Sequence, residues 1–492
     1  MTRSMRKWLV VPIALAGLVT GCAVGPDYAR PPVAPPAEFR SQVTPAETNS
    51  LADLPWWEAF NDPVLNGLIQ EVLAKNYNLR VATARVQQAR EQVTVARAAF
   101  YPALGYGAKA QRSKNYAAQL GIAGLDNNAT NLFAGVLTAS WELDVWGQIR
   151  RSSEAALAQL LATEEGRRGV ILSLVSETAQ AYFELLELDA LLLIARESTA
   201  AYEGVYKVFK DRLEFGVTSE LQTSRAEGDL FSAAATISEL KSQITAKENQ
   251  ISVLLGKNPG PVPRGTPLFE QPVVPSVPAG LPSALLERRP DLLQAEQQLV
   301  AANAEIGVAK AEFFPKLSLT GLLGKASPEL SAITSGAATI WSIAAGLTGP
   351  IFQGGKILAN YRATQAYWEQ VKWQYEQSVI TAFQEVSNNL AALEDLSGAE
   401  TDQARAVKSL EKAVGHANDR FFYGLSSYYE VLEAMQRLYP AQNAQTQTRA
   451  KRLIAYVQLY KALGGGWNVT DPQSMPPGQG RAGPAACAAA HC

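Results

Sequence analysis

Two long stretches of the chain have the pattern of unusually long helices. Residues 103–258 contain no proline, and residues 351–464 contain a single proline, Pro440. Both stretches are rich in Ala, Glu, Gln, Leu and Arg, which are good helix formers. A helix covering residues 150–213 would be roughly 95 Å long at 1.5 Å per residue. This length exceeds that of ordinary globular helices and favours a coiled-coil-like column.

Shorter segments alternate between apolar and polar residues in steps of two. In residues 133–145, one face carries Phe133, Leu137, Trp141, Leu143 and Val145, and the other carries Thr138, Ser140, Glu142 and Asp144. In residues 341–348, Trp341, Ile343, Ala345 and Leu347 alternate with Ser342, Ala344, Gly346 and Thr348. Segments of about ten residues with this alternation are typical of membrane β-strands. Soluble hairpins with one hydrated face have the same period, so this alternative stays open.

The sequence contains an internal repeat. Residues 78–104 resemble residues 291–317 at an offset of 213, and both segments run from a helical pattern into an aromatic-Pro stop. Further along, the offset is 208: Arg212, Gly216, Ser219 and Leu255-Gly256 match Arg420, Gly424, Ser427 and Leu463-Gly464. The difference of five predicts a loop of different length in each half. We divide the chain into a first repeat (51–258), a Pro-rich linker (259–282) and a second repeat (283–465).

The number of strands predicts an assembly. In each repeat, two strand-like segments follow the aromatic-Pro stop, which gives four strands per chain. Four strands cannot close a barrel, and an open sheet edge is not tolerated in lipid. A dimer would give an eight-stranded barrel filled by side chains, whereas a trimer would give twelve strands and a channel. The sequence therefore predicts a mixed α/β membrane duct, built as a homotrimer with a 12-stranded β-barrel.

The first residues form an export signal. Arg3, Arg6 and Lys7 precede an apolar segment, residues 8–19, which is too short to span a bilayer. The segment ends in Val-Thr-Gly before Cys22, an order that resembles the bacterial lipobox. We interpret residues 1–21 as a lipoprotein signal peptide; an ordinary signal peptide followed by a chance cysteine is the alternative.

Cleavage at the lipobox would leave a mature chain that begins at a lipidated Cys22. The next residue is Ala23 and not aspartate, which in the lipoprotein sorting rule indicates the outer membrane. Residues 22–50 then form the lipidated N-terminus and a stiff Pro-rich spacer. Because a lipid anchor alone binds moderately, a second membrane contact is expected.

Composition excludes several functions. The net charge is −2 without dense basic runs, so no nucleic-acid partner is expected. The chain has neither a glycine-rich phosphate loop after a strand nor HExxH or GxSxG, and we predict no enzyme, no catalytic residue and no cofactor beyond the covalent lipid. Cys487, His491 and Cys492 offer metal ligands in principle, but they lie in a Gly/Pro/Ala-rich tail. Its composition predicts disorder for residues 466–492 and no metal site.

Several motifs together resemble one family. They are Gly25-Pro26-Asp27-Tyr28, residues 281–292 (LPSALLERRPDL), Ala301-Ala302-Asn303-Ala304 and Phe313-Phe314-Pro315. This set is similar to the lipoprotein branch of the TolC-like outer membrane factors, the outer membrane efflux proteins of RND-type tripartite systems. Pro290 and Asp291 suit the first turn of a helix. We interpret Arg288 and Arg289 as structural, with a carboxylate partner.

The resemblance implies a complete architecture and its partners. The 12-stranded barrel in the outer membrane would be continuous with a long α-helical barrel that extends into the periplasm and carries a small equatorial domain. A periplasmic adaptor (membrane fusion) protein and an inner-membrane RND-type transporter would feed this homotrimeric duct. The implied function is export of small toxic compounds or drugs.

The resemblance also implies two functional sites at the helix turns. In residues 212–219 and 420–427, a glycine with positive φ ends one helix and Thr or Ser caps the next. The residues implied to contact the adaptor are Phe215, Gly216, Val217, Thr218, Tyr423, Gly424, Leu425 and Ser426. Glu430 and Glu433, three apart on one helix face, are implied to line the periplasmic aperture and to favour cations. Two hydrated glutamates outside the tunnel are the alternative.

One departure from the family concerns how the aperture is closed. Leu221-Gln222 stands where well-studied relatives carry Thr-Asp, and Ser426 stands where they carry Arg. Their inter-helix lock therefore does not transfer to this chain.

Other duct functions and a different class of protein remain as alternatives. A duct for type I protein secretion has the same architecture, and a periplasmic coiled-coil scaffold lipoprotein would need no pore. The mature chain contains only Met435 and Met475, which argues against a methionine relay for soft metals. The lipobox and the Arg-Arg-Pro motif favour efflux.

Overall fold

A computed structural model describes residues 23–40, 61–114, 129–272, 280 and 282–465. These residues form two compact units. One unit comprises residues up to 32, 85–164 and 294–376; the other comprises 33–84, 165–293 and 377 onward. Each unit therefore draws residues from both repeats. Cys22, the signal peptide and the tail after residue 465 lie outside the described residues.

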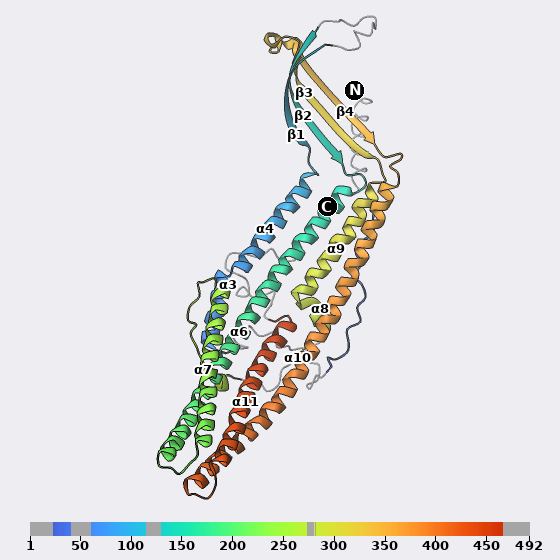
Figure 1. Cartoon of the computed structure of the whole chain (residues 1–492). Helices are drawn as coiled ribbons and strands as arrows, with labels where there is room; N and C mark the ends of the chain where they lie inside the picture. Colours follow the sequence, from blue (N-terminus) through green and yellow to red (C-terminus); the bar gives the residue numbers. More distant parts are fainter. Residues whose placement is uncertain (1–22, 41–60, 115–128, 273–279, 281, 466–492) are drawn as a thin grey trace. The chain divides into compact units, whose positions relative to one another are not determined.

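The secondary structure repeats along the chain (Figure 1). The elements that recur at an offset of 213 are α4 (Tyr77–Ala98) with α9 (Pro290–Ala311), and β1 (Ala103–Lys114) with β3 (Lys316–Ser327). Those that recur at 208 are α6 (Gln148–Glu214) with α10 (Lys356–Phe422), and α7 (Glu220–Leu254) with α11 (Tyr428–Ala462). Two pairs of corresponding elements differ in length between the repeats. β2 (Ala129–Leu143) is longer than β4 (Thr339–Thr348), and α3 (Pro63–Lys75) is longer than α8 (Leu285–Arg288). The five-residue difference lies between β1 and α6, where β2 has 15 residues and β4 has 10. A longer strand, and not the predicted difference in loop length alone, thus separates the two halves.

The long helices have the predicted lengths. α6 and α10 each contain 67 residues, which corresponds to about 100 Å at 1.5 Å per residue. α11 continues through Pro440 without ending there. None of the described helices combines the length and apolarity that a membrane-spanning helix needs.

The four strands of the described residues form one antiparallel sheet in the order β1-β2-β3-β4 (Figure 1). β1 pairs with β2 and β3 with β4, while the β2–β3 pairing joins the two repeats. The prediction of two strands per repeat is confirmed. The segment expected to reach Val145 ends at Leu143, because Asp144 accepts hydrogen bonds from the backbone N–H groups of Ile149 and Arg150 and starts the turn into α6.

The register gives the sheet two different faces, because directly paired residues lie on the same side. One face is apolar and includes Leu104, Tyr106, Leu137, Trp141, Leu319, Leu323, Trp341, Ile343 and Leu347. The other face carries mainly small and polar residues, among them Gly105, Thr138, Ser140, Ser318, Thr320 and Ser342. Large apolar side chains on the first face are exposed, Trp341 by 72% and Ile343 by 82%. An exposed apolar sheet face of this extent marks an interaction or membrane surface.

The N-terminal segment 23–32 is held by side chains of the same unit. The Arg151 guanidinium pairs with Asp27 at 2.7 Å, and the Tyr28 hydroxyl donates to Glu296 at 3.3 Å. A Cβ added to Gly25 would lie 2.6 Å from the Gly307 Cα, so this approach requires glycine. The Gly-Pro-Asp-Tyr motif is therefore an anchoring segment of the fold.

In the other unit, apolar residues of α3, α6, α7, α10 and α11 form the core. The largest fully buried side chains there include Leu65, Tyr182, Leu185, Ile251, Leu459 and Tyr460. Tyr182 also anchors polar groups: its hydroxyl donates to Asp62 at 3.1 Å and accepts from the Gly265 N–H at 2.8 Å. Asp62 in turn caps α3 by accepting from two backbone N–H groups. The start of the first repeat is thus tied to the linker.

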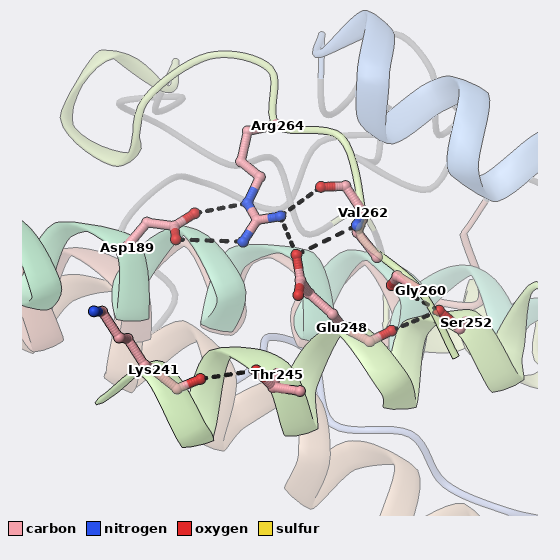
Figure 2. A network of polar contacts seen from close by, with 8 residues as sticks. All are labelled: Asp189, Lys241, Thr245, Glu248, Ser252, Gly260, Val262 and Arg264. Atoms are coloured by element: carbon pink, nitrogen blue, oxygen red, sulfur yellow. Dashed lines mark hydrogen bonds and ion pairs between the residues drawn. The ribbon is translucent and has the colours of Figure 1, made fainter. Parts of the chain in front are cut away.

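The linker is fixed by Arg264 (Figure 2). Its guanidinium contacts Asp189 of α6 at 2.8 Å and also Glu248 of α7. Glu248 accepts from the Val262 N–H as well. From the other repeat, Arg449 of α11 donates to the Gln271 carbonyl at 2.5 Å. These charge-assisted bonds connect α6 and α7 of the first repeat, and α11 of the second repeat, to one segment of the linker.

The Arg-Arg-Pro-Asp motif forms a second anchor. Pro290 begins α9, as predicted. The Arg289 side chain is 9% exposed and forks to Asp291 at 2.7 and 3.0 Å. It also pairs with Glu385 of α10 at 2.8 Å and donates to the Ala462 carbonyl at 2.9 Å. The predicted carboxylate partner of Arg289 is confirmed.

Candidate functional site

The helices α6 and α7 form one hairpin, and α10 and α11 form a second. The exposed turn of each hairpin is closed by a glycine with a left-handed backbone conformation. Gly216 has φ 69° and Gly424 has φ 71°. The backbone bonds are those of a Schellman motif: Val217 N–H donates to the Arg212 carbonyl at 2.9 Å, and Leu425 N–H to the Arg420 carbonyl at 2.8 Å. The predicted positive φ is confirmed at both glycines.

The capping prediction is partly wrong. Ser219 and Ser427 occupy the N-cap positions of α7 and α11 with extended backbone, but neither side chain makes a capping hydrogen bond. The Thr218 hydroxyl instead contacts the side-chain oxygen of Gln222. The glycines, and not the hydroxyl groups, therefore account for the geometry of these turns.

The turns expose large apolar side chains. Phe215 is 83% exposed, Tyr423 is 73% exposed, and Val217 and Leu425 are similarly exposed. A cluster of this kind at a helix turn is suited to contact another protein.

The same motif occurs at the other ends of the hairpins, in a packed environment. Gly256 has φ 67°, and the Lys257 N–H donates to the Ser252 carbonyl at 2.9 Å. A Cβ added to Gly256 would lie 2.8 Å from the Lys75 carbonyl oxygen, whereas at Gly216 and Gly424 it would meet nothing within 4 Å. The turn glycines thus differ in surroundings although their backbone conformation is the same.

The two predicted aperture residues each carry an arginine partner. Glu430 lies in the first turn of α11, and its carboxylate is 3.3 Å from the Arg420 guanidinium at the end of α10. Glu433 is 2.7 Å from Arg437, one turn further along α11. Both glutamate side chains are 47% exposed.

Sequence reasoning missed both arginines. Arg437 follows Glu433 by four residues, a spacing that places two side chains on one helix face, so this signal was present. Arg420 lies ten residues before Glu430 across the turn, and only the closed turn brings the two together.

An aromatic cluster joins the two hairpins near these turns. Tyr428 of α11 meets Phe209 of α6 edge-on with ring centroids 4.9 Å apart, and Phe421 of α10 at 5.5 Å. The Arg212 guanidinium lies over the Phe421 ring at 4.9 Å. Burial raises the pKa of the Tyr428 hydroxyl above its ordinary value.

A second aromatic pair lies further along the same helices. Tyr202 and Tyr439 meet at 5.9 Å, and burial raises the pKa of Tyr202 to about 12. Aromatic packing therefore contributes to the contact between α6 and the α10–α11 pair near the turns.

Within the described ranges, His, Cys, Asp and Glu side chains form no group of three that could hold a metal ion. Cys22 lies outside the described residues. Its neighbour Ala23 lies against Gly147, at the start of α6, since a Cβ added there would be 2.6 Å from the Ala23 Cβ.

A family model for outer membrane efflux proteins matches residues 68–257 and 281–465. The chain belongs to the outer membrane efflux protein family. This membership confirms the predicted resemblance, the outer membrane as the location, and efflux as the class of function. It is a family of transport ducts, not of enzymes.

The similarity of this efflux protein to individual relatives extends along nearly the whole chain. It is 33% identical over 463 residues to "Cation efflux system protein CusC" of Escherichia coli O6:H1, covering 93% of this chain and 98% of the relative. It is 34% identical over 468 residues to "Probable outer membrane lipoprotein SilC" of Salmonella typhimurium, covering 94% and 100%. It is 34% identical over 472 residues to "Toluene efflux pump outer membrane protein TtgC" of Pseudomonas putida, covering 94% and 96%.

Solved structures have the same fold. A crystal structure of CusC superimposes with a TM-score of 0.80 at 33% identity, covering 90% of this chain and 100% of the other. The open state of the Neisseria gonorrhoeae MtrE outer membrane channel gives 0.81 at 31% identity, covering 90% and 98%. The predicted mixed α/β duct fold is confirmed.

Proposed function

We propose that this efflux protein works as a homotrimeric exit duct of a tripartite pump, with a 12-stranded β-barrel in the outer membrane. The observation that carries the proposal is the four-stranded sheet. β1 and β4 are its edges, and its apolar face is suited to lipid. Because unpaired backbone groups are costly in lipid, the edges must pair with other copies, and three copies leave a lumen wide enough for transport.

The small and polar face of the sheet would line the lumen of this barrel. Thr138, Ser140 and Thr320 would then contact water and solutes, in the alternation typical of membrane barrels. The long helices α6, α7, α10 and α11 of the three chains would form the periplasmic tunnel.

The exposed turns are the proposed docking surface for a periplasmic adaptor protein, which would connect the duct to an inner-membrane RND-type transporter. Phe215, Val217, Tyr423 and Leu425 supply apolar contact area there. Glu430 and Glu433 are proposed to line the aperture next to this surface.

The proposed cargo is small toxic compounds. The names of the relatives include cation, toluene and antibiotic efflux, a range that fits an outer-membrane component which does not itself select the cargo. Selection would occur mainly at the inner-membrane transporter.

The test is reconstitution of the purified mature chain. We expect a species that migrates as a trimer in SDS without heating and as a monomer after heating, and discrete single-channel currents in planar bilayers. A monomer that inserts into no bilayer would contradict the duct and favour a periplasmic scaffold.

We further predict that Cys22→Ser abolishes acylation but leaves trimers that retain part of their efflux activity. The physical reason is that the sheet provides its own apolar membrane contact, while the lipid adds a second one. The measurement is palmitate labelling together with trimer content of outer-membrane fractions. A correctly exported, unacylated chain that forms no trimers would show that the sheet alone does not direct insertion.

A further inference from the structure

We propose that Arg420 and Arg437 are the counter-charges of the aperture and, with Glu430 and Glu433, set its ion selectivity. The proposal rests on the proposed function, in which the start of α11 lines the aperture of a trimer. With these arginines, an aperture that was expected to be acidic has equal numbers of positive and negative side chains.

The first pair bridges the turn between two helices. Arg420 lies in the last turn of α10 and Glu430 in the first turn of α11, with a separation of 3.3 Å. A cation at a helix C-terminus and an anion at a helix N-terminus are both favoured by the helix dipole. The closed turn at Gly424 holds the two helix ends together, so the pairing follows from the fold of the hairpin.

The second pair lies one helical turn further from the hairpin turn. Glu433 and Arg437 are four residues apart on α11, with the glutamate on the N-terminal side, which is the favourable orientation, and they are 2.7 Å apart. Glu430 and Glu433 thus present two carboxylates on one helix face, and each has a guanidinium group within its own chain.

The corresponding positions of the first repeat have a different pattern. At the offset of 208, Gln222 corresponds to Glu430, Arg225 to Glu433 and Asp229 to Arg437. Arg212 corresponds to Arg420 but lies over the Phe421 ring. The arrangement of two carboxylates with two guanidinium groups therefore belongs to the second hairpin, where the aperture is proposed.

These pairs affect the potential in the aperture more than the stability of the fold. All four side chains are about half exposed or more, between 47% and 69%, so each pair stabilises the chain little. In a narrow passage the same charges act on every passing ion. With equal numbers of carboxylates and guanidinium groups, their contributions nearly cancel.

The proposal makes opposite predictions for the two halves of each pair. Arg420→Gln with Arg437→Gln leaves the carboxylates unpaired, and the cation-to-anion permeability ratio should rise several-fold above that of the unmodified chain. Glu430→Gln with Glu433→Gln leaves the guanidinium groups and should lower the ratio by a similar factor. All four changes together should return it close to the original value.

The measurement is the reversal potential of single channels in a KCl gradient across a planar bilayer, with trimer content checked in SDS. Arg405→Gln is the matched control, because it removes an arginine from an exposed pair with Asp402 elsewhere on α10; its permeability ratio should not change. Arg420→Lys with Arg437→Lys keeps the charge and should also behave like the unmodified chain. At about 1 M salt, where screening acts over roughly 3 Å, the differences should shrink.

The outcomes separate this inference from the proposed function. If the arginine double variant keeps the original ratio while the glutamate double variant changes it, the carboxylates act without these counter-charges and the inference is overturned. An unchanged ratio in both double variants overturns the inference together with the aperture assignment, although channels still form. Failure of the unmodified chain to form channels contradicts the proposed function itself.

Discussion

Replacing Arg289 with alanine is expected to lower the thermal stability of the protein by several degrees. Its side chain is 9% exposed and is shared between Asp291, Glu385 and the carbonyl oxygen of Ala462. Breaking a buried ion pair by removing one partner costs about 3–5 kcal/mol. We expect a value near 3 kcal/mol, since Asp291 and Glu385 are themselves about half exposed and can be hydrated.

The measurement is the unfolding temperature, or the unfolding rate at a fixed temperature if unfolding is irreversible. Arg289→Lys keeps the charge but lacks the planar fork that binds Asp291 through two nitrogens, so it should be intermediate. Arg405→Ala, which removes an exposed pair, should change stability by less than about 1 kcal/mol. An Arg289→Ala protein as stable as the Arg405→Ala control would show that the junction before α9 does not depend on this side chain.

Replacing Gly216 and Gly424 together with valine is expected to weaken adaptor binding roughly tenfold, which corresponds to about 1.4 kcal/mol. A β-branched residue is strained at a φ near 70°, so the turns must change shape and move the exposed Phe215 and Tyr423. The trimer should keep its thermal stability within a few degrees, because a local change at an exposed helix end opens little of the structure. The measurement is the affinity of the purified trimer for the periplasmic adaptor protein of its pump.

Gly256→Ala is a control for which we expect the reverse result, a loss of stability without a loss of adaptor binding. The conformation is the same, but the added Cβ would lie 2.8 Å from the Lys75 carbonyl oxygen, so this variant should lose stability and bind the adaptor normally once folded. Gly216→Ala and Gly424→Ala meet no atoms within 4 Å and should cost only about 1–2 kcal/mol of backbone strain each. Unaltered adaptor affinity in the valine double variant would remove the turns from the docking surface.

The sequence by itself determined the elements and their order. The range 150–213, expected to be helical, lies within α6 (Gln148–Glu214), because helix propensity and the lack of proline act locally. Two strands per repeat followed from a period of two residues, and the positive φ of Gly216 and Gly424 from the need to close a helix. The sequence predicted that Arg289 has a carboxylate partner, but not which residue supplies it.

Only the tertiary structure decided which distant residues meet. Arg264 with Asp189, Arg151 with Asp27 and Tyr28 with Glu296 are separated by 75, 124 and 268 positions, and no periodicity encodes such pairings. The pairing of Glu430 with Arg420 likewise depends on how tightly the turn closes. Local patterns fix backbone conformation residue by residue, whereas the charge around a glutamate depends on every helix packed beside it. For this reason the spacing of Glu433 and Arg437 on one helix face could be read from the sequence, whereas the Arg420 partner of Glu430 came only from the closed turn.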